Sequence, residues 1–135
     1  MKRYEEAAGY FRRLVRIFKT NLNVREALCY ALQELGNESH AQGRYLMAEA
    51  CFEEALENQS ENAAYLYNLG NVQRELGQLD LAITSYQKAL DLNPKLYHAK
   101  VHLVHQKQQY TKLSAGNWQA SRLGIWPTGR LRSLG

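Results

Sequence analysis

The feature of this sequence that most restricts its fold is a repeat with an offset of 34 residues in the middle of the chain. When the sequence is compared with itself at this offset, without gaps, the same residue types coincide over two full units. The identical pairs are Leu32/Leu66, Leu35/Leu69, Gly36/Gly70, Asn37/Asn71, Gly43/Gly77, Ala48/Ala82, Ala55/Ala89 and Leu56/Leu90. Phe52 coincides with Tyr86, so an aromatic residue is retained there. Such a pattern predicts stacked copies of one supersecondary unit.

Each unit has the pattern of two helices joined by a glycine. In the second unit, apolar residues recur at helical spacing over 66–76. Gly77 then interrupts the pattern, because glycine tolerates the left-handed conformation that ends a helix. A second apolar stripe covers 82–90 and stops before Pro94, which disfavours helical geometry in the residue preceding it. The sequence therefore predicts a pair of antiparallel helices in each unit.

These units resemble the tetratricopeptide repeat (TPR) family. The residues of the second unit that carry the family pattern are Leu69, Gly70, Gly77, Ala82, Tyr86, Ala89 and Pro94. The unit departs from the pattern at Leu66, where the family usually has Trp, and at Gln73, where it usually has Tyr. The resemblance implies an all-α fold, a short TPR-type α-solenoid in which antiparallel helix pairs form a right-handed superhelix. It says less about function, because the family is a scaffold for many binding tasks.

The chain around the repeats divides into segments of different character. Tyr4 and Phe11 continue toward Phe18 as the apolar face of an N-terminal helix, and an atypical helix must cover the open end of a stack. We expect an amphipathic N-terminal helix (a degenerate repeat) over 1–28, TPR 1 over 29–62, TPR 2 over 63–96, a capping helix over 97–113 and a basic flexible tail over 114–135.

Charge is unevenly distributed along the chain. Residues 1–26 carry seven Lys or Arg and three Glu, residues 27–91 carry three cations and ten acids, and residues 92–135 carry seven cations and no acid. The net charges are therefore +4, −7 and +7, which sum to the +4 of the whole chain. This asymmetry indicates that the acidic middle and the basic ends have different tasks.

The composition excludes several classes of protein. No apolar run approaches the length of about 18 residues that a transmembrane helix needs. The charged start of the chain also lacks the apolar core of a signal peptide. Cys29 and Cys51 are too few for a disulfide scaffold and lack the spacing of a metal knuckle. We therefore expect a protein of a reducing compartment, the cytoplasm.

The sequence contains none of the catalytic motifs built on a P-loop, a nucleophile elbow, a zinc-binding helix or a dinucleotide turn. Glu53 and Glu54 are adjacent carboxylates, for which a solvated helix face is a better explanation than acid–base catalysis. His98, His102 and His105 share one helical stripe, but three histidines on one straight helix rarely close a tetrahedral metal site. We predict no enzymatic activity, no cofactor and no metal.

The TPR resemblance implies that the first helix of each pair lines a concave groove that holds extended peptides. The residues on the stripes opposite the core pattern are the candidate peptide-binding residues. They are Gln33, Asn37, Tyr67, Asn68, Asn71, Arg74, His98 and His102. Asparagine suits such a groove because its amide both donates to and accepts from a peptide backbone.

The resemblance also allows a comparison with one group of TPR domains. Those that hold the acidic C-terminal tails of heat-shock chaperones use a two-carboxylate clamp of Lys, two Asn, Lys and Arg. At the matching positions this chain has Gln33, Asn37, Asn68, His98 and His102. Both asparagines are present, but the three permanent cations are missing, and charge-assisted hydrogen bonds are about twice as strong as neutral ones. We therefore favour another peptide over a chaperone tail.

The function predicted from these observations is a non-catalytic TPR scaffold or adaptor that binds a protein or peptide partner in the groove. A small core makes a homodimer through an end helix a further option. One alternative is the TPR adaptor portion of a larger enzyme assembly, for example one associated with a glycosyltransferase. Another is an adaptor whose basic ends bind anionic membrane or RNA. We do not favour nucleic acid or membrane as a partner, because the cations of the N-terminal helix fit the solvated face of a packing helix.

Overall fold

The computed structural model describes the backbone of residues 2–122 and the side chains of residues 3–115. This part of the chain consists of helices joined by short loops, with no strand in residues 2–122. The helices are α1 (Lys2–Ile17), α2 (Leu22–Ala41), α3 (Tyr45–Asn58), α4 (Ala63–Glu75), α5 (Leu79–Leu92) and α6 (Tyr97–Arg122).

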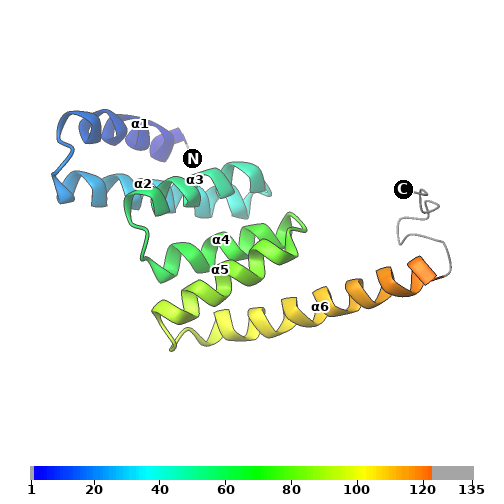
Figure 1. Ribbon diagram of the computed structural model, residues 1–135. Helices are drawn as coiled ribbons and strands as arrows, with labels where there is room; N and C mark the ends of the chain where they lie inside the picture. Colours follow the sequence, from blue (N-terminus) through cyan, green and yellow to red (C-terminus); the bar gives the residue numbers. More distant parts are fainter. Residues whose placement is uncertain (1, 123–135) are drawn as a thin grey trace.

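The helices form a stack in which each one packs against the next along the chain (Figure 1). Helices α2 and α3 form the first pair, α4 and α5 form the second, and α3 packs against α4 between them. Helix α2 also contacts α4, so the first helices of the two pairs are neighbours. Helices α1 and α6 lie at opposite ends of the stack (Figure 1). The predicted all-α TPR-type solenoid is confirmed.

The two helix pairs have the same turn. Gly43 and Gly77 have φ values of 76° and 77°, which an L side chain rarely adopts. In the first turn the N–H of Arg44 donates to the carbonyl of Ser39 at 2.8 Å, and in the second the N–H of Gln78 donates to the carbonyl of Gln73 at 2.9 Å. These hydrogen bonds cap the C-terminus of the first helix, and the chain reverses direction at the glycine. The second helix of each pair therefore runs antiparallel to the first.

An aromatic ring fixes the distance between the helices of each pair. The ring of Phe52 covers Gly36, and the ring of Tyr86 covers Gly70. A Cβ atom built on these glycines would lie 2.7 Å from Phe52 Cζ and 2.8 Å from Tyr86 Cε1. The repeated glycine and the repeated aromatic residue are therefore two halves of one packing contact.

Helix α1 covers the N-terminal end of the stack. Ala8 is buried in a cluster with Leu28 of α2, and Phe11 packs against that cluster. The Arg12 guanidinium donates from Nε and Nη2 to the two carboxylate oxygens of Glu54 in α3, at 2.6 and 2.8 Å. Helix α1 is thus joined to both helices of the first pair.

Residues 1–28, which were expected to form a single N-terminal helix, are divided between two helices. Helix α1 ends at Ile17, and α2 begins at Leu22. The reason is an N-cap: the side-chain oxygen of Asn21 accepts from the N–H groups of Asn23 and Val24 at 3.0 and 3.3 Å. Phe18, which was expected on the apolar face of the N-terminal helix, lies beyond its end and is 51% exposed.

At the other end, α6 covers the second pair and continues past residue 113. Ala99 and Leu103 are buried in a cluster with Tyr86. No proline occurs in residues 97–122, so nothing in the sequence forces the helix to stop at 113. The segment expected as a flexible tail over 114–135 overlaps α6 as far as Arg122. Its remainder, residues 123–135, lies outside the described residues.

Candidate peptide-binding groove

The predicted binding residues lie on the first helices of the pairs and on α6. On α2, Gln33 is half-buried and Asn37 is exposed. On α4, Tyr67, Asn68, Asn71 and Arg74 are half-buried; on α6, His98 is exposed and His102 half-buried. Five residues between α4, α5 and α6 form a connected group, which we call the His102 cluster. Its members are Tyr67, Asn71, Arg74, Tyr86 and His102.

A hydrogen bond between Arg74 and His102 joins α4 to α6. Arg74 Nη1 lies 2.7 Å from His102 Nδ1. A guanidinium can only donate, so Nδ1 accepts and the proton of the neutral imidazole is on Nε2. The other terminal nitrogen of Arg74 lies 3.7 Å from the carboxylate of Glu75. The Arg74 guanidinium is therefore held at a defined place on the surface between α4 and α6.

Aromatic contacts hold the His102 ring in this position. The imidazole stacks on Tyr86, with ring centroids 5.7 Å apart and planes at 20°. Tyr67 lies beside both rings, at 5.9 Å from Tyr86 and 6.0 Å from His102. The rings of Tyr67, Tyr86 and His102, from α4, α5 and α6, thus pack against one another.

The side-chain oxygen of Asn71 accepts a hydrogen bond from within the protein. The Tyr86 hydroxyl donates to Asn71 Oδ1 at 2.5 Å. Burial raises the pKa of Tyr86 to about 12, so the phenol is neutral and remains a donor at physiological pH. The amide nitrogen of Asn71 keeps its two donors, whereas its oxygen is engaged. The residue can therefore donate to a ligand carbonyl but is poorly placed to accept.

The ionisation of His102 decides whether it can act as a cation. Burial lowers the pKa of His102 below its usual value of 6.5, and Arg74, His98 and His105 lower it further because their charges repel a second positive charge. His102 is therefore neutral at physiological pH. It does not replace the permanent cation that a two-carboxylate clamp has at this position.

The structure brings together four of the eight predicted residues, namely Tyr67, Asn71, Arg74 and His102. Gln33, Asn37, Asn68 and His98 do not belong to the cluster. The sequence indicated Tyr86 only as a core aromatic residue. Its hydroxyl contact with Asn71 was not predicted, although a tyrosine where the other repeat has Phe52 is the signal that could have indicated it.

The described residues contain no group of three or more His, Cys, Asp or Glu side chains arranged to hold a metal ion. Cys29 and Cys51 are free and buried. Burial raises the pKa of Cys29, and it raises that of Cys51 to about 11. Among helices α1 to α6, as far as the structure describes them, none has the length and apolarity needed to cross a membrane.

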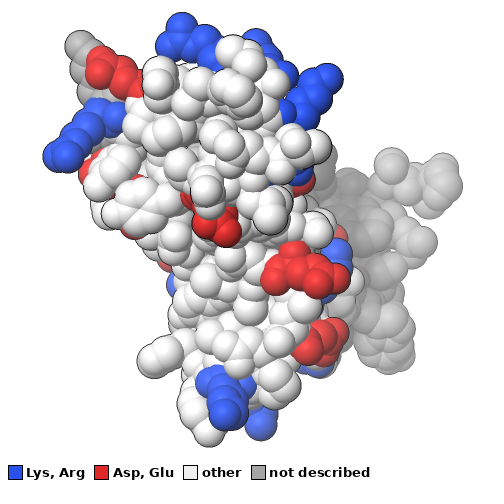
Figure 2. All heavy atoms as spheres, turned by 90° about the vertical axis from the view of Figure 1, so that its left-hand side faces the viewer, with Lys and Arg blue, Asp and Glu red and all other residues white. Residues whose placement is uncertain are grey.

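The charges on the surface follow the distribution along the sequence. Figure 2 shows Lys and Arg side chains gathered at the α1 end of the stack and again at the opposite end, with most of the acidic side chains between them. The half-buried Arg74 belongs to the pair of repeats, in which acids outnumber cations.

Comparisons with known proteins agree with this architecture. Two models of the tetratricopeptide repeat match the chain, one over residues 63–96 and the other over residues 30–62. Among solved structures, the chain is similar to the first TPR of Spaghetti (RPAP3) bound to the HSP90 peptide SRMEEVD. That similarity has a TM-score of 0.56 and 17% sequence identity and covers 82% of each chain, so it concerns the fold alone.

Two curated relatives are the Photosystem I assembly protein Ycf3 of Synechococcus elongatus and that of a further Synechococcus strain. Each is 30% identical to this chain over 109 residues, which are 77% of this chain and 62% of the relative. The chain therefore spans less than two thirds of the length of these relatives. Because two repeats match the family models, and the same residues form the two stacked helix pairs, the chain belongs to the tetratricopeptide repeat family.

Proposed function

We propose that this chain is a non-catalytic adaptor that binds an extended peptide or a partner helix along α2, α4 and α6. The observation that carries this proposal is the His102 cluster, which fixes Arg74 and the amide nitrogen of Asn71 at the junction of α4 and α6. Donors that are already held in place lose little conformational entropy when a ligand binds.

The groups in the groove favour a particular ligand. Asn37 and Asn68 offer amides that donate to and accept from a peptide backbone. Asn71 offers its two amide donors, whereas its oxygen already accepts one hydrogen bond, from the Tyr86 hydroxyl. Arg74 has five N–H donors, of which His102 takes one, so its guanidinium is suited to a ligand carboxylate. We infer an extended segment with one acidic side chain near Arg74.

This ligand differs from a chaperone tail that needs a clamp with several fixed cations. The matching positions hold Gln33, His98 and His102, and the last of these is kept neutral by its surroundings. A TPR domain of similar fold is bound to an HSP90 peptide, so peptide binding is compatible with this fold, whereas the residues of this chain argue for a different peptide.

The relatives named as photosystem I assembly proteins support a role in which the adaptor brings the subunits of a protein complex together. The ligand would then be a segment of a client subunit, and the adaptor itself would catalyse nothing. Two buried free thiols fit a reducing compartment, so we place this activity in the cytoplasm. A soluble enzymatic activity of the isolated chain would contradict the non-catalytic role.

The test uses peptides selected from a displayed library of 12-residue peptides on the full chain. The affinity of the selected peptides is compared between the wild type and the double variant Asn37→Ala, Asn68→Ala by isothermal titration. A neutral hydrogen bond contributes about 0.5–1.5 kcal/mol, so the loss of two should weaken binding by roughly 5- to 150-fold. Asn71 is left intact because its replacement would also unpair the Tyr86 hydroxyl.

The matched control is Lys88→Ala, since Lys88 is exposed on the second helix α5 and lies outside the groove. We expect this variant to bind like the wild type. Equal affinity of the double variant and the wild type would contradict the proposed surface. Chemical-shift changes confined to α3 and α5 on peptide addition would contradict it as well.

A further inference from the structure

Helix α6 has a face that corresponds to the paired face of α4. On α4, the residues turned to α5 are Leu66, Gly70 and Gln73, which are all buried. The residues 34 positions later are Lys100, Val104 and Lys107 on α6, and all three are exposed. We call these residues, together with the exposed Thr111 and Lys112, the α6 outer face. It occupies the place at which a second helix would complete a repeat.

Val104 determines what kind of helix can pack here. In both repeats the second helix presents an aromatic ring to a glycine, and a Cβ atom at that glycine would come within 2.7–2.8 Å of the ring. Val104 stands at the glycine position and carries a full side chain, which is 51% exposed. A helix with an aromatic residue in that register is therefore excluded, and the partner needs a small residue opposite Val104.

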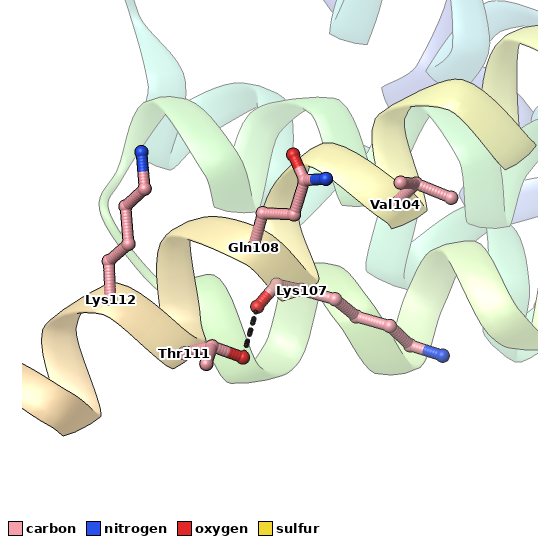
Figure 3. A pocket seen from close by; sticks show the side chains of 5 residues that line it. All are labelled: Val104, Lys107, Gln108, Thr111 and Lys112. Carbon is pink, nitrogen blue, oxygen red and sulfur yellow. Dashed lines mark hydrogen bonds between the residues drawn. The ribbon is translucent and has the colours of Figure 1, made fainter.

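The charge of the α6 outer face restricts the partner further. Figure 3 shows Lys107 and Lys112 extending from α6 in different directions, with Gln108 between them in this view. These three residues, with Val104 and Thr111, line an open surface groove of about 570 Å³. Residues 92–135 contain no Asp or Glu, so no carboxylate next to these lysines in sequence compensates them. The complementary surface is an acidic helix face with small and apolar residues.

The chain itself contains such a surface on α3. Leu46, Ala50, Glu53 and Glu57 follow one another at spacings of four, three and four residues, so they share one side of the helix. All four are exposed, Leu46 to 70%. We call them the α3 outer face. Glu49, on the same helix, lies near Glu53: its pKa is raised by burial and, to a smaller extent, by the charge of Glu53.

The spacings of the two faces are the same. Lys100, Val104, Lys107 and Thr111 also follow at four, three and four residues. When two such helices lie parallel in register, Val104 meets Ala50, Lys107 meets Glu53, and Thr111 with Lys112 meets Glu57. The aliphatic part of Lys100 then covers Leu46, as long lysine stems do on apolar surfaces.

We propose that the α6 outer face of one copy of this chain packs against the α3 outer face of a second copy. Within one copy the α3 outer face belongs to the first repeat, whereas α6 follows the second repeat and is separated from α3 by α4 and α5 (Figure 1). On α6, Lys100, Val104, Lys107 and Thr111 lie on the side opposite to His102, so this contact leaves the peptide groove open. Failure of the pairing and failure of peptide binding are therefore distinguishable.

The experiment is a charge exchange with the full chain, followed by sedimentation equilibrium over a range of concentrations at about 20 mM and about 500 mM salt, because screening weakens exposed ion pairs. One variant is Lys107→Glu, Lys112→Glu and the other is Glu53→Lys, Glu57→Lys. We expect the wild type to associate at low salt, each variant alone to weaken association at least tenfold, and an equimolar mixture of the two variants to recover it.

The recovery in the mixture follows from the pairing, since each variant then offers the face that the other lacks. It also shows that both variants are folded. The control Arg3→Glu, Arg13→Glu changes exposed positions of α1 and makes the same change in net charge as Lys107→Glu, Lys112→Glu. It should associate like the wild type. A wild type that stays monomeric at low salt overturns the pairing. So does association that survives either exchange, or a mixture that fails to recover.

Discussion

Gln106 provides a direct test of how α6 is packed. Its side chain is 0% exposed, and neither Oε1 nor Nε2 has a hydrogen-bond partner. The corresponding residue of α4, 34 positions earlier, is the buried Val72. We predict that Gln106→Leu stabilises the folded chain, because leucine has a similar volume and removes two unpaired polar atoms from the core.

The size of the effect follows from the burial. A buried polar group without a partner costs about 1–3 kcal/mol of stability. No cavity contribution is expected, because the replacement preserves volume. For a domain of this size, 1 kcal/mol corresponds to roughly 4 °C in melting temperature, so Gln106→Leu should raise the melting temperature by about 4–12 °C.

The assay is thermal and urea unfolding followed by circular dichroism, together with amide hydrogen exchange. Gln73→Leu is the matched control. Gln73 is also buried, at 5% exposure, but its Oε1 accepts from the Ser85 hydroxyl at 2.6 Å. The control should lower stability by about 1–3 kcal/mol because the hydroxyl loses its partner. Protection gained in Gln106→Leu should be largest in α5 and α6. A lower melting temperature for Gln106→Leu, or stabilisation by both changes, would refute the reasoning.

Three further predictions concern the core, the cluster and the thiols. Gly70→Ala should lower stability by about 1–3 kcal/mol because its Cβ would lie 2.8 Å from the Tyr86 ring, whereas Gly9→Ala, with nothing within 4 Å, should raise helix stability by about 0.5–1 kcal/mol; urea midpoints measure both. The folded pKa of His102 lies below its unfolded value of about 6.5, so its contribution to stability is complete above that pH and is lost as the pH falls through the folded pKa. The urea midpoint of the wild type should therefore be lower at pH 5 than at pH 7.5, and this decrease should be smaller in His102→Phe. An equal decrease in the variant and the wild type would count against the Arg74 contact. Cys51, with its pKa of about 11, should resist alkylation by iodoacetamide at pH 8 until urea unfolds the chain, and rapid labelling of the native protein would contradict its burial.

Periodicity allowed the repeats to be predicted because it reports local structure. The glycine at 77 and the aromatic residue at 86 have counterparts 34 residues earlier, and both copies form the same turn and the same ring-to-glycine contact. The N-terminal boundary was harder, because the cap that starts α2 rests on Asn21, in a stretch outside the repeat. From the sequence alone, a single asparagine that caps a helix cannot be distinguished from the other polar residues around it.

The candidate site shows a different limit. Helical spacing correctly placed the predicted residues on α2, α4 and α6, because a stripe on a helix follows from 3.6 residues per turn. It could not show that His102 accepts from Arg74, or that Tyr86 occupies the oxygen of Asn71. These partners are 28 and 15 residues apart in sequence, and their contacts depend on how far one helix is rotated against the next.

The sequence by itself determined the helix pairs, their glycine turns, and the separation of an acidic middle from basic ends. Each of these depends on residue type and spacing along the chain. Only the tertiary structure decided which polar groups remain free for a ligand, that burial lowers the pKa of His102, and that Val104 of α6 is exposed where the earlier helices have a buried glycine. The physical reason is that burial and hydrogen-bond partners are set by the distance and rotation between packed helices, and no local pattern records them.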